Sequence, residues 1–278
     1  MLKVNGVIVH RPLISIITPS FNHAQFIERT IQSILTQHGN FDLEYLVLDG
    51  GSTDGTVDIL RRFDGQLIWS STPDKGQVDA INKGLRAATG DIVGWVNSDD
   101  ILMPGALAKV AAAFMTQPQV EWVHGRCEVI DLHDQPIRRW ISAYKHFRAQ
   151  RHSFRNLLTE NYVSQMTTFW RRRVHVEIGY LDESLKLAFD YEFWLRLAKR
   201  GDPIYLEDRI ACFRWYETSK SGANYKRQFE EDAEIAAQYV PSDDWLLGAR
   251  KRLKNIAIYN IYQIMQKFRK IRTKEFAN

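Results

Sequence analysis

Residues 91–102, DIVGWVNSDDIL, join a strongly apolar run to a cluster of polar side chains. The run from Ile92 to Trp95 predicts a buried strand, and Asp99 and Asp100 follow where that strand would reach the surface. Two adjacent carboxylates repel each other when both are ionised. A divalent cation that prefers oxygen ligands would remove this repulsion, and an ordinary solvated turn is the alternative.

Two further polar turns follow apolar strands in the same way. TPSFN (18–22) ends a strand that begins at Leu13, and DGGSTDG (49–55) ends a second strand. Helical patterns separate these strands, with Asn22 as the expected cap of the first helix and Pro104 in the first turn of the helix after the third polar turn. Near-continuous apolar strands alternating with helices predict a parallel sheet covered on both faces. All three turns would then meet at one edge of the sheet.

The second half of the chain has a mixed pattern. Residues 120–131, 136–142, 164–172 and 204–215 are expected as strands that add antiparallel edges to the same sheet, and residues 190–201 as a helix. From about residue 223 the pattern is helical. The predicted fold class is therefore α/β, with a mostly parallel, Rossmann-like sheet flanked by helices and a C-terminal helical extension. The predicted domains are residues 1–222 and 223–278.

Composition excludes several classes of protein. The 278 residues contain no run of 18 apolar residues and no secretion signal, which predicts a cytoplasmic protein without a membrane-spanning helix. The two cysteines, Cys127 and Cys212, have no paired spacing and are expected to be buried and reduced. The net charge of +4 is only mildly basic.

The stretch LVLDGGSTDGT, residues 46–56, allows three interpretations. Asp49 leaves an apolar strand before two glycines, where its carboxylate could accept hydrogen bonds from a nucleoside base or ribose. An EF-hand calcium loop would need a closing glutamate and flanking helices that this stretch lacks. A simple Asx turn is the third interpretation.

Taken in order, four segments resemble a family 2 glycosyltransferase of the GT-A fold. They are ISIITPSFNHAQFIERTIQSILTQ (14–37), LEYLVLDGGSTDGT (43–56), DKGQVDAINKGLRAATGDIVGWVNSDD (74–100) and DYEFWLRLAKRG (190–201). The resemblance covers about residues 13–221. It implies an inverting enzyme that takes a hexosyl or N-acetylhexosaminyl group from a nucleotide-diphosphate sugar, with UDP as the default nucleotide and Mn²⁺ or Mg²⁺ as cofactor. A glycan or lipid-linked glycan would be the acceptor, as in bacterial surface-polysaccharide biosynthesis.

The resemblance also implies roles for individual residues. Thr18 and Pro19 would line the base pocket, and Asp49 would hydrogen-bond the base. Asp79 matches an acidic position near the nucleotide sugar. In the SDD triplet, which takes the place of the DXD motif of the family, Asp99 would face the ribose or sugar and Asp100 would bind the metal.

An inverting displacement needs a carboxylate to take the proton of the attacking hydroxyl. The resemblance places this role on Asp190 in LAFDYEFW, where many relatives have Glu-Asp and this chain has Phe189 before the aspartate. An apolar neighbour would raise the pKa of Asp190 and strengthen it as a base. The alternative is that Asp190 only caps the following helix.

One segment departs from the family pattern. In CFRWYETSKSG, Tyr216 stands where relatives often have a histidine that completes the metal shell. A protonated tyrosine is a poor ligand, so the metal would be held by Asp100, diphosphate and water, with Glu217 as a substitute ligand. Arg214, with Ser219 and Lys220, would contact the diphosphate as a flap, and surface roles are the alternative.

The C-terminal segment alternates apolar and basic residues in a helical pattern. Residues 245–278 would bind peripherally to the anionic inner face of the cell membrane. The alternative is that they pack on the catalytic domain or on a second subunit. Nucleic acid is not expected as a partner, since the basic residues lack the aromatic side chains on which the bases of a single strand would stack. The argument rests on the following residues: Lys251, Arg252, Lys254, Ile256, Ile258, Ile261, Ile264, Met265, Lys267, Arg269, Lys270, Arg272 and Lys274.

The sequence also allows two other functions. A nucleotidyltransferase also uses a nucleotide, a metal and a related sheet, but it would be expected to have a glycine- and arginine-rich loop in place of TPSFNHAQF (18–26). A degenerate domain that only binds glycans is the second alternative. The carboxylates retained at all three strand-end turns argue against it.

Overall fold

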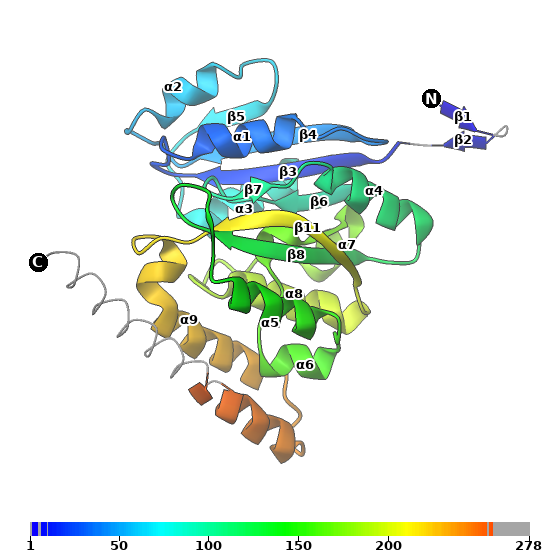
Figure 1. The fold of residues 1–278 in the computed structure, drawn as a ribbon, viewed down its shortest axis with the longest axis vertical. Coiled ribbons are helices and arrows are strands. Elements are labelled where there is room, and N and C mark those ends of the chain that lie inside the picture. Colours follow the sequence, from blue (N-terminus) through cyan, green and yellow to red (C-terminus); the bar gives the residue numbers. More distant parts are fainter. Residues whose placement is uncertain (1, 5–6, 10, 255, 258–278) are drawn as a thin grey trace, which may run out of the picture.

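The computed structural model describes residues 2–4, 7–9, 11–254 and 256–257. Figure 1 shows a central twisted sheet with helices on both sides and a short hairpin, β1 (Leu2–Val4) and β2 (Val7–Val9), apart from it. In the described part of the chain the sheet has nine strands. Eight of them run in the order β5-β4-β3-β6-β10-β8-β11-β7, and β9 pairs with β8.

The strands of the first half are parallel, as predicted. They are β3 (Leu13–Ser20), β4 (Asp42–Asp49), β5 (Ile68–Ser71) and β6 (Ile92–Trp95). Between them lie α1 (Ile27–Leu35), α2 (Thr56–Arg61) and α3 (Gln77–Ala87). The carboxyl ends of these strands therefore meet at one edge, which places the three polar turns side by side.

The second half completes the sheet with strands of both directions. They are β7 (Ile101–Leu102), β8 (Trp122–Ile130), β9 (Pro136–Ile137), β10 (Phe169–Arg171) and β11 (Ile204–Arg214). β8 and β11 are parallel to each other. The short β10 is antiparallel to both β6 and β8 and lies between them, so it joins the two halves at the centre of the sheet rather than adding an edge.

The remaining helices cover the sheet. They are α4 (Ala106–Thr116), α5 (Arg139–Ala149), α6 (Phe154–Thr159), α7 (Arg172–Ile178), α8 (Phe189–Arg200) and α9 (Lys220–Ala237), with the 3₁₀ turn η1 (Gln165–Thr167). Residues 245–254 form a further helical segment, called here the C-terminal helix. Among the described helices, we find none with the length and apolar character needed to cross a bilayer.

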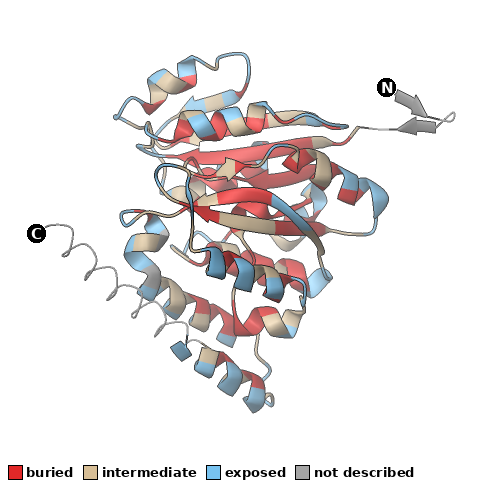
Figure 2. Cartoon of the chain, in the orientation of Figure 1, coloured by how far each residue is buried: buried red, intermediate tan, exposed pale blue. Residues whose placement is uncertain are grey.

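Two hydrophobic cores lie on opposite faces of the sheet. Successive residues of a strand point to opposite faces, so Ile16 packs in one core and Ile17 in the other. The first core contains α1, α2 and α4, and the second contains α3, α8 and α9. Figure 2 shows the buried residues concentrated in the sheet and on the inward sides of the helices.

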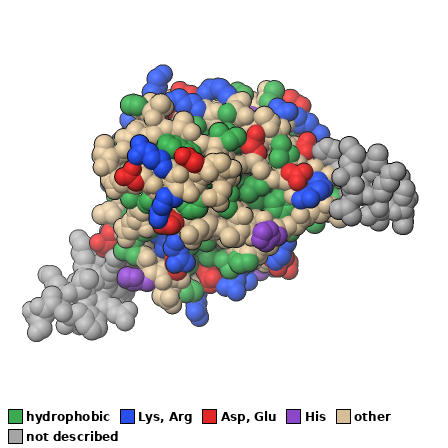
Figure 3. All heavy atoms as spheres, turned by 90° about the horizontal axis from the view of Figure 1, so that it is seen from above, with side chains coloured by type: hydrophobic (Ala, Val, Ile, Leu, Met, Phe, Trp, Pro, Cys, Tyr) green, Lys and Arg blue, Asp and Glu red, His purple; other side chains and the backbone are tan. Residues whose placement is uncertain are grey.

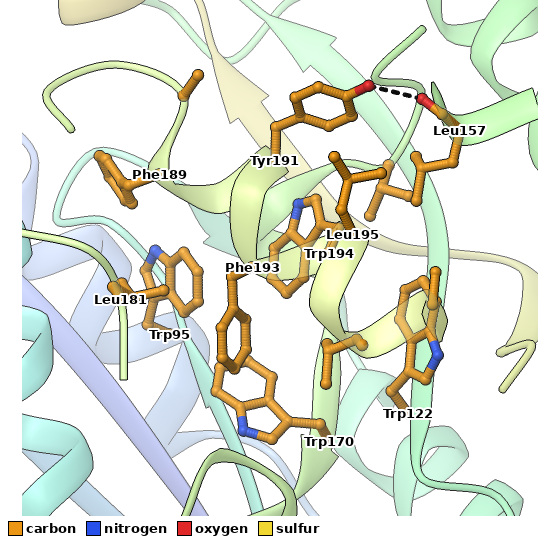
Figure 4. Close-up of a cluster of buried hydrophobic side chains, with 14 of the residues drawn as sticks. Trp95, Trp122, Leu157, Trp170, Leu181, Phe189, Tyr191, Phe193, Trp194 and Leu195 are labelled. Atoms are coloured by element: carbon orange, nitrogen blue, oxygen red, sulfur yellow. Dashed lines mark hydrogen bonds between the residues drawn. The ribbon is translucent and has the colours of Figure 1, made fainter. Parts of the chain in front are cut away.

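The second core is rich in aromatic rings. Trp95 and Trp194 stack with 5.4 Å between ring centroids, and Trp170 meets Trp95 edge-on at 5.6 Å. Figure 4 shows Trp194 of α8 together with Trp95 and Trp170 of the sheet, and α8 also carries Phe189 and Tyr191 in its first turn. Trp95 and Trp194 belong to this core, since they are 1% and 0% exposed. This packing fixes the start of α8 firmly against the sheet.

Three local predictions are wrong. Residues 136–142 were expected as a strand, but only Pro136 and Ile137 pair with β8, and α5 begins at Arg139. Asn22 does not cap α1, because its side-chain oxygen accepts a hydrogen bond from Thr53 N at 2.9 Å. Pro104 lies just before α4 and not in its first turn, which starts at Ala106.

The C-terminal extension shares the second core with α8. Ile235, Ala236 and Leu247 are buried in that core. The proposed boundary at residue 222 falls inside α9, and the division into two domains stays a prediction. Residues 258–278, on which much of the membrane hypothesis rests, lie outside the described residues.

Charged side chains are mixed on the face seen in Figure 3, where Lys and Arg lie among Asp and Glu. Several form surface ion pairs, such as Arg62 with Glu28 at 2.8 Å.

The described cysteines, Cys127 and Cys212, are not disulfide-bonded, and Cys212 is buried.

Candidate active site

A cavity of about 810 Å³ opens at the carboxyl ends of the parallel strands. The turns after β3, β4 and β6 form one wall with Pro19, Gly50 and Asp99, and the helices α5, α8 and α9 form the other. This is where an open α/β sheet binds its ligands. The predicted convergence of the three polar turns is thus present in the fold.

Hydrogen bonds between the turns hold them together. His23 Nδ1 and Ser98 Oγ are 2.6 Å apart, which joins the first turn to the third. Ser52 Oγ accepts from Asn22 N at 2.7 Å, which joins the first turn to the second. Gly51 has a φ of 86° in the second turn, a conformation that glycine adopts without strain. The wall is therefore ordered before any ligand binds.

Of the two residues expected at the base pocket, Pro19 lines the cavity. Thr18 is fully buried behind it, with its hydroxyl 3.1 Å from the Tyr45 hydroxyl. These positions follow from the alternation of β3, in which neighbouring residues face opposite sides of the sheet.

Asp49 lies directly behind the cavity wall. It is 2% exposed, and its carboxylate accepts hydrogen bonds from Ser52 N at 2.8 Å and from the Ser71 hydroxyl at 2.6 Å. Gly51 N and the Ser52 hydroxyl also donate to it. Asp49 therefore shapes the turn whose Gly50 faces the cavity.

Asp79 is directed toward α3 and the preceding turn. It accepts from Lys75 N at 3.0 Å and pairs with Lys83 at 2.9 Å. These contacts, first the backbone hydrogen bond and then Lys83, lower the pKa of Asp79 below its usual value. Asp79 fixes the turn before α3, which brings Gly76 and Gln77 to the cavity.

The two carboxylates of the SDD triplet have different environments. Asp99 lines the cavity and accepts a hydrogen bond from the Tyr216 hydroxyl at 3.0 Å. Asp100 is fully buried and accepts from Arg214 N at 3.0 Å and from Asn97 Nδ2 at 3.2 Å. Burial, and then the charge of Asp99, raise the pKa of Asp100 well above its usual range.

Arg214 stabilises this turn from behind. Its side chain is 2% exposed and donates to the carbonyl oxygens of Asp99, at 2.9 Å, and Asp131, at 2.8 Å. It also pairs with Asp134 at 2.5 Å. Of the other residues of this segment, Tyr216, Ser219 and Lys220 line the cavity. The Lys220 ammonium donates to Gln77 at 2.8 Å, so it bridges α9 and α3 across the cavity.

Asp190 lines the same cavity as Asp99, in the first turn of α8. The N-cap alternative is wrong, because Ala188 occupies that position and Asp190 accepts a hydrogen bond from the amide of the next residue, Tyr191. Burial raises the pKa of Asp190 to about 6, against the opposing effects of that hydrogen bond and of Lys145 and Lys220. A carboxylate with this pKa is ionised at neutral pH and is a stronger base than an ordinary one.

The structure adds residues that the sequence did not single out. Lys145 of α5 and Asp232 of α9 reach the same cavity as Asp190. Gln165 also lines the cavity and donates to Trp95 O at 2.6 Å. No local motif marks Lys145 or Asp232, since only the packing of α5 and α9 brings them here.

Comparison with known proteins identifies the family. Residues 15–179, more than half of the chain, match the family model described as glycosyl transferase family 2. An uncharacterized glycosyltransferase of Mycobacterium tuberculosis is 29% identical over 195 residues, which cover 69% of this chain and 71% of the relative.

Two solved structures share the architecture. TarS of S. aureus in complex with UDP-GlcNAc has a TM-score of 0.62 and 22% identity, over 87% of this chain and 70% of that chain. A mannosyltransferase of Pyrobaculum calidifontis in complex with GDP-Man and Mn²⁺ has a TM-score of 0.61 and 17% identity, over 95% of this chain and 83% of that chain. At these identities the likeness shows the fold, which is GT-A. The polar turns gather at the strand ends, and the sequence matches the family model from residue 15 to residue 179. This chain therefore belongs to glycosyl transferase family 2.

Proposed function

We propose that this chain transfers a hexosyl or N-acetylhexosaminyl group, with inversion, from a UDP-sugar to a hydroxyl of a glycan or lipid-linked glycan. The observation that supports it best is that Asp99 and Asp190 line one cavity of about 810 Å³. A cavity of this size takes a nucleotide sugar together with part of an acceptor.

The nucleotide half of the cavity is formed by the strand-end turns. Pro19 and Gly50 would contact the base and ribose, with Thr18 and Asp49 holding their backbone from behind. Asp99 would face the ribose or the diphosphate. In this assignment Asp79 and Arg214 position neighbouring turns and do not touch the ligand.

Asp190 acts as the base in this mechanism. Its carboxylate takes the proton of the acceptor hydroxyl while that oxygen attacks the anomeric carbon, and the diphosphate leaves from the opposite side. Lys220 contacts residues of both halves of the cavity, because its ammonium donates to Gln77 and lies 5.0 Å from the centroid of the Phe189 ring. It would bind a diphosphate oxygen.

A divalent cation fits the SDD turn through few protein ligands. In the described part of the chain no three His, Cys, Asp or Glu side chains converge on one point. Mg²⁺ and Mn²⁺ need only one or two carboxylates when phosphate oxygens and water fill the shell. Asp99 is the carboxylate at the cavity, and Asp100 would join it by turning from Arg214 N. Bound there, the ion would stabilise the negative charge of the leaving diphosphate.

Membrane contact is proposed for the C-terminal helix. Trp245, Leu246 and Leu253 are 73%, 61% and 69% exposed, and Arg250 and Arg252 lie between them on the sequence. Exposed aromatic and aliphatic side chains beside cations suit an anionic bilayer surface. Flotation with phosphatidylglycerol vesicles should fall for Trp245→Gln with Leu253→Gln, and unchanged flotation would end this part of the proposal.

The function is tested by a screen of nucleotide sugars followed by one substitution. UDP-sugars with Mn²⁺ should raise Tm, and the best of them should be hydrolysed or transferred. Asp190→Asn should keep the Tm shift and lose about 100-fold or more of the turnover, the range for a general base. Near-normal turnover of Asp190→Asn would show that the base is another residue. Binding of UDP-sugars without any turnover of the unmodified chain would favour a degenerate binding domain.

A further inference from the structure

Asp232 of α9 has a buried oxygen without a hydrogen-bond partner. The residue is 7% exposed and lines the cavity that also holds Asp190. Within the described residues nothing donates to its Oδ1. A buried carboxylate oxygen without a donor is costly, and such an oxygen in a native protein calls for an explanation.

The charges around Asp232 come from several elements. Asp190 of α8 and Lys145 of α5 line the same cavity. Lys251 of the C-terminal helix is 7% exposed and lies 3.5 Å from the Tyr191 hydroxyl. Burial and then the charge of Asp190 raise the pKa of Asp232 to about 7, while Lys251 and Lys145 oppose this effect. Two carboxylates therefore share one cavity.

The neighbouring carboxylate of Glu231 is occupied and cannot substitute for Asp232. It accepts from the amides of Leu187 and Ala188, at 2.7 Å and 2.6 Å, just before α8. These hydrogen bonds fix α9 against the start of α8. They also hold Asp232, one residue further on, beside Asp190.

We propose that Asp232 positions the acceptor, with its free Oδ1 accepting a hydrogen bond from a hydroxyl of the acceptor sugar next to the hydroxyl that Asp190 deprotonates. The ligand class is thus a sugar with neighbouring hydroxyl groups. This inference rests on the proposed function, because it needs Asp190 as the base. Three more polar side chains line the same cavity and give such a ligand further partners: Ser142 of α5, Asn161 and Gln228 of α9.

The test compares Asp232→Leu, Asp232→Asn and the unmodified chain. The probes are methyl hexopyranosides and their monodeoxy analogues, with the nucleotide sugar selected by thermal shift at saturation. Asp232→Leu should lower kcat/KM for the methyl hexopyranoside about 10- to 100-fold, the range for a hydrogen bond to a charged group. Asp232→Asn, which keeps an accepting oxygen, should recover part of the loss. Hydrolysis of the nucleotide sugar by water should change less than about 2-fold.

One monodeoxy analogue should identify the hydroxyl. On the unmodified chain it should react about 10- to 100-fold more slowly than the parent sugar, and on Asp232→Leu it should react as fast as the parent, because each change removes the same contact. Glu230→Gln, an exposed position on the same helix, is the matched control and should behave as the unmodified chain. Equal losses of hydrolysis and transfer by Asp232→Leu would overturn the inference.

A second measurement needs no acceptor. If Asp232 were a structural partner of Lys251, Asp232→Leu would lower Tm by several degrees at pH 8, and that result would also overturn the inference. The expected result is a Tm equal to or above that of the unmodified chain, because an unsatisfied buried carboxylate has been removed. An inactive Asp190→Asn beside an unaffected Asp232→Leu rejects only this inference. An active Asp190→Asn shows that the base is another residue and rejects this inference as well, because it needs Asp190 as the base. No turnover of any nucleotide sugar by the unmodified chain rejects the proposed function itself.

Discussion

The raised pKa of Asp190 predicts that the catalytic base lowers the stability of the fold at neutral pH. In the unfolded chain its pKa is near 3.8, and in the folded chain burial raises it to about 6. The folded state therefore binds the proton more tightly. The stability gained from this proton is fully present below about pH 4 and is lost as the pH rises through about 6. Asn at this position does not titrate.

The size of this loss of stability follows from the rise in the pKa of Asp190. About 2 pKa units at 1.36 kcal/mol each give about 3 kcal/mol. Because Asp190 faces the cavity and water reaches it, this is an upper limit. Asp190→Asn should thus be up to about 3 kcal/mol more stable than the unmodified chain at pH 8 and equally stable at pH 4. For a chain of this length the Tm difference at pH 8 would be up to about 6 °C.

Thermal unfolding followed by circular dichroism at pH 4, 6 and 8 measures this difference. Asp208→Asn is the control, since Asp208 has a side chain 60% exposed in a surface pair with Lys109, and its Tm should change little at each pH. A Tm difference for Asp190→Asn that stays constant with pH would refute the raised pKa. A variant less stable at every pH would show that Asp190 supports α8 structurally.

Three further predictions concern the walls of the cavity and the core. Arg214→Met should lose about 3–5 kcal/mol of the free energy of unfolding, measured by urea denaturation, because it removes a buried cation that holds the Asp99 carbonyl. Gly84→Ala should lose about 1–3 kcal/mol, since the added Cβ would lie 2.5 Å from Ile17 Cγ2, and an unchanged urea midpoint would contradict this. Tyr216→His should lower the Mn²⁺ concentration needed for half-maximal Tm shift with a UDP-sugar, because imidazole binds Mn²⁺ and a protonated phenol does not. Tyr216→Phe, as its control, should not lower that concentration.

The sequence predicted the first half of the fold well because local signals there agree with the global structure. Ile92 to Trp95 is apolar on both faces, as a strand covered by helices on both sides must be. The turns that follow the strands carry Gly, Pro, Asn and Asp, which end strands through their own backbone preferences. Parallel strands separated by helices then fix which ends of the strands meet.

The second half was harder because its elements depend on distant partners. Residues 136–142 were expected as a strand, but Ser142, Arg148 and Ala149 are buried at helical spacing, and Arg138 takes a φ of 51° before the helix. A strand was expected over residues 164–172, but η1 occupies Gln165–Thr167 and only Phe169–Arg171 form β10, which pairs with both β6 and β8. Its position at the centre of the sheet is a tertiary property.

The candidate site was also predicted only in part from the sequence. The motif placed Asp99 and Asp100 at the strand end, but adjacent residues face different directions, and only packing shows that Asp99 faces the cavity while Asp100 is buried against Arg214. Asn22 was predicted to cap α1 because asparagine is common at the N-cap position of helices. Its side-chain oxygen accepts from Thr53 N in the second turn instead, and Phe26 takes the N-cap position of α1.

The contacts of α9 bear on whether the chain can be divided at residue 222. Glu231 accepts hydrogen bonds from the amides of Leu187 and Ala188, and these amides lead directly into the turn that carries Asp190. A chain that ended at residue 222 would lose this acceptor, and the second core would lose Ile235. We therefore expect the truncated chain to bind a UDP-sugar weakly or not at all and to lose turnover entirely. Full turnover by the truncated chain would show that α9 is an independent appendage, and Asp232 could then have no part in catalysis.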